Sequence, residues 1–70
     1  MTELINSAKV SFEKAMEIAV SRAGGGAVEE IELEYENDLL IYDVIIKSNN
    51  RRYEITIDAV TGAVIEMERL

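Results

Sequence analysis

The chain contains no cysteine and no histidine. Without cysteine it can form no disulfide framework and offers no thiolate as a nucleophile or metal ligand. Without histidine it lacks the commonest general base and the commonest zinc ligand. Since the usual pairs of nucleophile and base cannot be assembled from these residues, we predict that the chain is not an enzyme and uses no cofactor or metal.

Basic residues are also scarce. The 7 lysines and arginines stand against 14 aspartates and glutamates, which gives a net charge of −7. A field of this sign repels phosphate backbones and anionic lipid head groups. We therefore expect a neutral or basic protein partner, or self-association, and no binding to nucleic acid.

Long apolar runs are missing as well. No run approaches the roughly 20 residues of a membrane-spanning helix, and the start "MTELINSAKV" lacks the basic-then-apolar layout of a signal peptide. We expect no direct membrane insertion, and any signal or anchor to lie outside this chain. The 70 residues predict a single domain over 1–70, which at this size buries only about 60% of its unfolded surface and leaves little room for a deep pocket.

The first half of the chain has the period of a helix. Apolar residues recur at spacings of three and four and predict a helix over about 11–23, with Ser11 as its N-cap; they are Phe12, Ala15, Met16, Ala19, Val20 and Ala23. "GGG" at 24–26 is interpreted as the end of this helix rather than as a phosphate-binding loop, because such a loop precedes a helix. Residues 2–9 are expected to form an extra helical turn or a frayed arm.

From residue 28 onward the apolar period changes to two. It predicts strands over about 28–36, 39–47, 52–58 and 63–68, joined by tight turns at "ND" and "SNN". Connections this short permit only antiparallel neighbours. The predicted fold class is α+β: one N-terminal helix packed on an antiparallel three- to four-stranded β-meander.

The segment "DAVTG" joins the last two predicted strands. Asp58 can accept hydrogen bonds from the N–H groups of the turn, Thr61 can bridge through its hydroxyl, and Gly62 supplies a residue with positive φ. A catalytic or metal-binding Asp58 would need a second acid, a base or a histidine at a useful spacing, which its sequence neighbours do not offer. We interpret the three residues as a structural turn.

Three segments together resemble the PepSY domain family: "SFEKAMEIAVSRAGG", "IYDVIIK" and "YEITIDAVTGAVIEME", over residues 10–68. The resemblance implies a helix packed on an antiparallel sheet and an extracytoplasmic location, in the bacterial cell envelope or secreted. It also implies a non-enzymatic protein-interaction module that inhibits or regulates a peptidase. The alternative is a structural or assembly domain that dimerises or docks within a larger envelope protein.

Two further features have to be weighed as possible sites. Alternate glutamates of the first predicted strand share one face, but their spacing of roughly 7 Å is too wide for one calcium ion, so we interpret this face as solvated; they are Glu30, Glu32, Glu34 and Glu36. Leu39, Ile41 and Ile45 lie on the opposite side of the second strand from Tyr42 and its in-phase neighbours. Because a single helix covers one side of a sheet, these three residues are either covered within the monomer or form a protein-interaction face.

Overall fold

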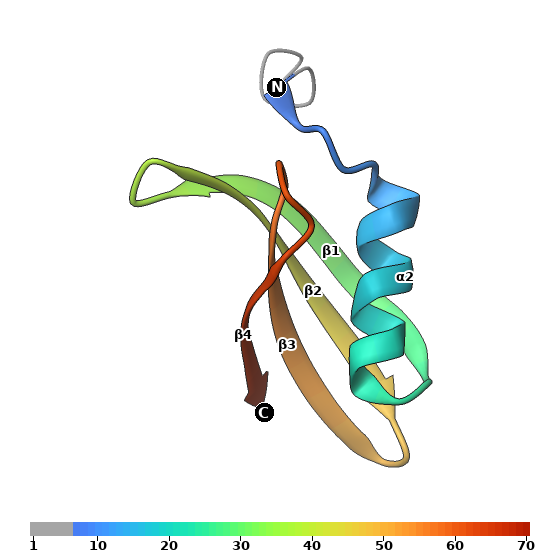
Figure 1. Cartoon of the computed structure of the whole chain (residues 1–70). Helices are drawn as coiled ribbons and strands as arrows, with labels where there is room; N and C mark the ends of the chain where they lie inside the picture. The colour runs from blue at the N-terminus through green and yellow to red at the C-terminus, as the bar shows by residue number, and fades with distance from the viewer. Residues whose placement is uncertain (1–6) are drawn as a thin grey trace.

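The computed structural model describes residues 7–70, in which the helix α2 packs on a four-stranded antiparallel sheet in the order β1-β2-β3-β4 (Figure 1). The predicted α+β class is confirmed, with four strands in the meander. The elements are α2 (Phe12–Ala23), β1 (Ala27–Glu36), β2 (Leu39–Ser48), β3 (Arg51–Asp58) and β4 (Val64–Arg69).

Both ends of α2 are capped by local hydrogen bonds. The Ser11 hydroxyl accepts from the backbone N–H of Lys14 at 3.0 Å. At the other end Gly24 is left-handed, with φ +80°. The N–H groups of Gly24 and Gly25 donate to the carbonyls of Ser21 and Val20. This pair of bonds satisfies carbonyls that have no partner within the helix, so the glycine run ends the helix at Ala23.

Two asparagine-rich turns determine the strand register. Asn37 and Asp38 join β1 to β2, and Asn49 and Asn50 join β2 to β3; all four have φ between +52° and +65°. Two successive residues in this region form the type I′ turn, whose twist matches that of antiparallel strands. Asparagine and aspartate tolerate the left-handed conformation better than other residues with a Cβ, which explains their presence here.

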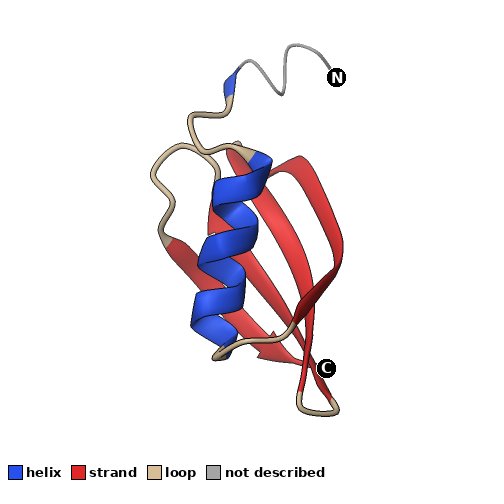
Figure 2. Ribbon diagram, turned by 90° about the vertical axis from the view of Figure 1, so that its right-hand side faces the viewer, coloured by secondary structure: helices blue, strands red, loops and turns tan. Residues whose placement is uncertain are grey.

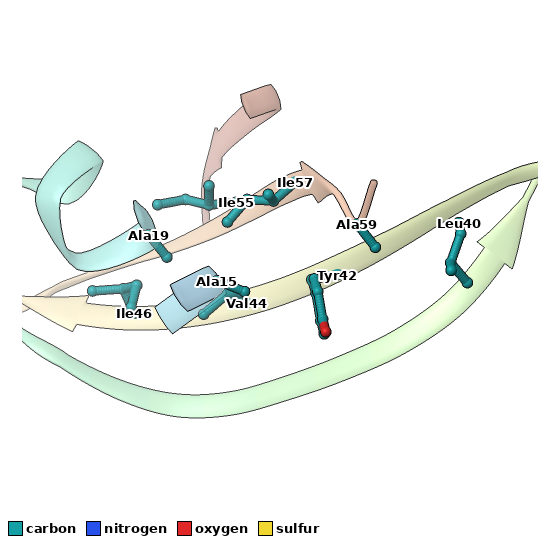
Figure 3. Packing of buried hydrophobic residues seen from close by; sticks show 9 residues of the cluster. All are labelled: Ala15, Ala19, Leu40, Tyr42, Val44, Ile46, Ile55, Ile57 and Ala59. Atoms are coloured by element: carbon teal, nitrogen blue, oxygen red, sulfur yellow. The ribbon is translucent and has the colours of Figure 1, made fainter. Parts of the chain in front are cut away.

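The core lies between α2 and one face of the central strands (Figure 3). Ala15 and Ala19 are fully buried and let the helix approach the sheet closely, and Phe12 contacts Tyr42 edge to face at 5.2 Å between ring centroids. β2 and β3 contribute Leu40, Tyr42, Val44, Ile46, Ile55 and Ile57, and the turn after β3 contributes Ala59. Helix and sheet form two layers, and the helix lies in front of the strands in Figure 2.

The segment before the helix is held against the end of β3. The N–H groups of Lys9 and Val10 donate to the carbonyl of Ala59, and the Tyr42 hydroxyl donates to the carbonyl of Val10 at 2.5 Å. The predicted extra turn or arm at 2–9 lies mostly outside the described residues. Among residues 7–70 no helix has the length and apolar content needed to cross a membrane.

Candidate interaction surface

Asp58, Thr61 and Gly62 lie in the turn between β3 and β4. One carboxylate oxygen of Asp58 accepts from the N–H groups of Val60 and Thr61 at 2.8 and 3.0 Å. The N–H of Gly62, which has φ +83°, donates to the Asp58 carbonyl, and the N–H of Ala63 donates to the Thr61 hydroxyl. The N–H donors of Thr61 and Val60 stabilise the charged form and lower the pKa of Asp58. The carboxylate is thus used within its own turn.

The face of the sheet opposite α2 carries a continuous field of acidic side chains, which we call the acidic face. Strand pairing aligns Glu32, Asp43, Thr56 and Glu66 in one row across the four strands. The acidic residues of this face are Glu30, Glu32, Glu34, Glu36, Asp43, Glu54, Glu66 and Glu68. The predicted glutamate array of β1 is therefore one edge of a larger surface.

Desolvation and mutual repulsion both act on the carboxyl groups of the acidic face. Desolvation first, and then the charges of Asp43, Glu32 and Glu36, raise the pKa of Glu34. Desolvation raises the pKa of Glu54, and the charges of Asp43 and of Glu68 and Glu66 on β4 raise it further. The Thr56 hydroxyl donates to Asp43 at 2.7 Å. The charges of this face are thus coupled from β1 to β4.

The cations on this side of the sheet are Lys47 and Arg52, which are paired with each other at one end of β2 and β3. Within residues 7–70, Arg52 pairs with Glu29 at 2.8 Å and Lys14 pairs with Glu17 along the helix. Neither acidic partner belongs to the acidic face as defined above. Among the same residues no group of three or more acidic side chains is placed to hold a metal ion. The acidic face is therefore an electrostatic surface that a cationic partner would complement.

Leu39, Ile41 and Ile45 lie on the acidic face, but their exposure differs. Leu39 is 40% exposed and Ile45 is half-buried, whereas Ile41 is only 1% exposed. Ile41 is paired with Glu34 on β1 and Asp58 on β3. For Ile41 the first of the two alternatives holds, because its side chain is covered within the monomer. Leu39 and Ile45 keep accessible apolar surface among the acidic residues.

Sequence reasoning missed the exposed apolar residues of the last strand. Ile65 is 49% exposed, Met67 is 40% exposed, and Leu70 just beyond β4 is 58% exposed. The helix packs mainly over β1, β2 and β3, and β4 is the edge strand at the opposite end of the sheet from β1 (Figure 1). The available signal was position, since the last strand of a meander is an edge and has a neighbour on one side only.

The comparisons with known proteins give one family. The family model described as PepSY, "Peptidase propeptide and YPEB domain", matches residues 9–68. No curated protein and no solved structure matches the chain. The match covers the helix, β1 to β3, the turn that contains Asp58, and β4 except for Arg69.

Proposed function

The chain belongs to the PepSY family, and on that premise we propose that it is a non-enzymatic protein-interaction module that inhibits or regulates a peptidase in the bacterial cell envelope. The observation that carries this proposal is the family match over residues 9–68, because the family includes peptidase propeptides. The match spans the folded body of the domain, so the proposal concerns the domain as a whole.

The hydrogen bonds and charges of the carboxylates support a role in binding rather than in catalysis. Asp58 accepts two backbone N–H bonds, and its lowered pKa makes it a poor general base at neutral pH. Asp43 accepts from Thr56 at the centre of the acidic face. These groups stabilise the turn and the sheet, and the remaining carboxylates form a surface whose charge favours association with a cationic patch of another protein.

Capture followed by inhibition tests the proposal. The purified full-length chain is immobilised, exposed to a bacterial envelope extract, and the bound proteins are identified by mass spectrometry. We expect a peptidase among them, and we expect the soluble chain to slow its hydrolysis of a fluorogenic peptide while remaining intact. The test variant is Glu34→Gln with Glu54→Gln on the acidic face. Its matched control is Glu13→Gln with Glu17→Gln on the helix.

Both double variants remove two charges, so a difference between them reports the surface and not the net charge. Weaker inhibition by the acidic-face variant alone would support the proposal. Failure to capture any peptidase, or capture without an effect on hydrolysis, would overturn the regulatory role.

A structural or assembly domain is the second candidate, and the exposed Ile65 and Met67 on an outermost strand favour it. Such a domain would use this surface to dimerise or to dock within a larger envelope protein. Sedimentation over a range of concentrations distinguishes the two. A stable dimer that captures no peptidase would favour assembly, and a monomer that inhibits would exclude it.

A further inference from the structure

The open edge of β4 has a specific hydrogen-bonding pattern. The N–H of Leu70 donates to the carbonyl of Arg52 at 2.8 Å, and Glu68 and Glu66 are paired with Glu54 and Thr56. Because ladder bonds fall on alternate residues, the backbone groups of Met67 and Arg69 point away from β3. Within residues 7–70, β4 pairs with β3 alone. These N–H and C=O groups are available to another strand.

The two sides of this edge differ in chemistry. Glu66 and Glu68 lie on the acidic face, beside Glu54 on β3. Met67, paired with Ile55, lies on the helix side of the sheet, yet it is 40% exposed. An added antiparallel strand places its residues directly opposite these side chains. Basic residues would face the glutamates, and apolar residues would face Met67.

The β1 edge is less open. Its helix-side residues Ile31 and Leu33 are half-buried and packed against the core, and only Tyr35, near the end of the strand, is 56% exposed. Each edge ladder contains one register shift, between Val28 and Glu30 on β1 and between Val64 and Glu66 on β4, so bulges do not distinguish the two edges. Beyond its shift, β4 pairs with β3 in regular register from Glu66 to Arg69. Since α2 packs on β1 and mainly over the first three strands, β4 is the edge that the helix leaves largely uncovered, and Met67 is accessible beside its free backbone groups.

A second copy of the chain fits this edge poorly. If two β4 strands paired antiparallel about a two-fold axis at Met67, Glu66 of each copy would lie opposite Glu68 of the other. Like charges directly across a strand pair are destabilising. Pairing of two β4 edges is therefore disfavoured, and pairing with a positively charged strand is favoured.

We propose that the β4 edge binds an extended segment of a partner protein, in which lysine or arginine alternates with apolar residues, as a fifth strand of the sheet. This inference rests on the proposed protein-interaction function and specifies its binding surface and the chemistry of the partner. Backbone hydrogen bonds to Met67 and Arg69 supply affinity, and the glutamates and Met67 select the alternation.

The test uses the full-length chain and a blocked peptide of about seven residues, matched to the length of an ordinary strand, in which lysine and valine alternate. Binding is followed by the amide NMR spectrum of the isotope-labelled chain. We expect saturable shifts concentrated on β4, and slower hydrogen exchange at the amides of Met67 and Arg69. A control peptide of the same composition, with its lysines and valines in separate blocks, should bind at least about fivefold more weakly because it cannot match both sides of the edge.

Variants separate the β4 edge from the general negative charge. Glu66→Gln with Glu68→Gln should weaken binding of the alternating peptide about fivefold, whereas Glu30→Gln with Glu32→Gln on β1, with the same change in net charge, should leave it within about twofold. Equal weakening by both pairs, equal binding of the two peptides, or shifts on β1 or the helix would overturn the inference.

The failure of this inference can be told apart from failure of the proposed function. Suppose that the chain captures and inhibits a peptidase, and that the Glu66→Gln and Glu68→Gln variant inhibits it equally strongly. The proposed function would then be supported, and the β4 edge would be the wrong binding surface. If the alternating peptide binds β4 as expected but no peptidase is captured, strand binding at the β4 edge is supported and the regulatory role is wrong.

Discussion

The third glycine of the run at 24–26 should be the most sensitive position outside the core. A Cβ added at Gly26, which has φ +109°, would lie 2.4 Å from the backbone oxygen of Lys47 and 2.9 Å from the Cβ of Ser48. Real Cβ atoms do not approach a carbonyl oxygen this closely. Because the obstacle is backbone of β2, Gly26→Ala must separate the start of β1 from β2.

The magnitude follows from a neighbouring control. Gly25 has a similar φ of +116°, but a Cβ there would meet nothing within 4 Å. Gly25→Ala should therefore report backbone strain alone, about 1–3 kcal/mol. Gly26→Ala should add the cost of forcing atoms into an occupied space, typically about 1–3 kcal/mol more. Since a domain of 70 residues is stable by about 4–10 kcal/mol, Gly26→Ala removes much of the total.

Urea unfolding followed by far-ultraviolet circular dichroism measures both variants. With a slope of about 1 kcal/mol per molar urea, the midpoint of Gly26→Ala should fall at least about 1 M below that of Gly25→Ala. Equal midpoints for the two variants would refute the reasoning, because strain at positive φ would then account for both. If Gly26→Ala does not fold at all while Gly25→Ala does, the close approach to β2 is again the cause.

Three further results are expected. Asp58→Ala should lower the free energy of unfolding by about 1–2 kcal/mol at pH 7. Because the pKa of Asp58 is lowered, this difference should be present above about pH 4 and shrink as the pH falls through the lowered pKa. Urea titrations at several pH values would show this. Tyr42→Phe removes the hydroxyl that donates to Val10 and should cost about 1 kcal/mol by thermal melting; no change would mean that this bond does not anchor the segment before the helix. Glu34→Gln with Glu54→Gln should raise the melting temperature at pH 7, since the raised pKa of each carboxyl means that its charge opposes folding. The gain should disappear below about pH 4, where both groups are protonated in the unmodified chain. A gain that persists there would show that it does not come from the two charges.

The sequence by itself determined the local structure. Ser11 caps the helix and Gly24 ends it, because capping depends on residues within one turn of each other. The period of two in the second half gives strands, and the turn residues Asn37 and Asp38 allow only an antiparallel neighbour. The class of the fold follows from these elements, since a short meander with one apolar face needs one helix to cover it.

Only the tertiary structure decided which surfaces are free. The sequence pattern left open whether Ile41 is covered within the monomer or exposed for a partner, and its side chain is buried. Glutamates of β3 and β4 extend the acidic array of β1 only because strand pairing aligns residues far apart in the chain. Likewise Gly26 is required by a carbonyl on β2, and Met67 is exposed because the helix lies mainly over the other strands. Periodicity assigns a residue to a face, whereas exposure depends on the neighbours that pack there.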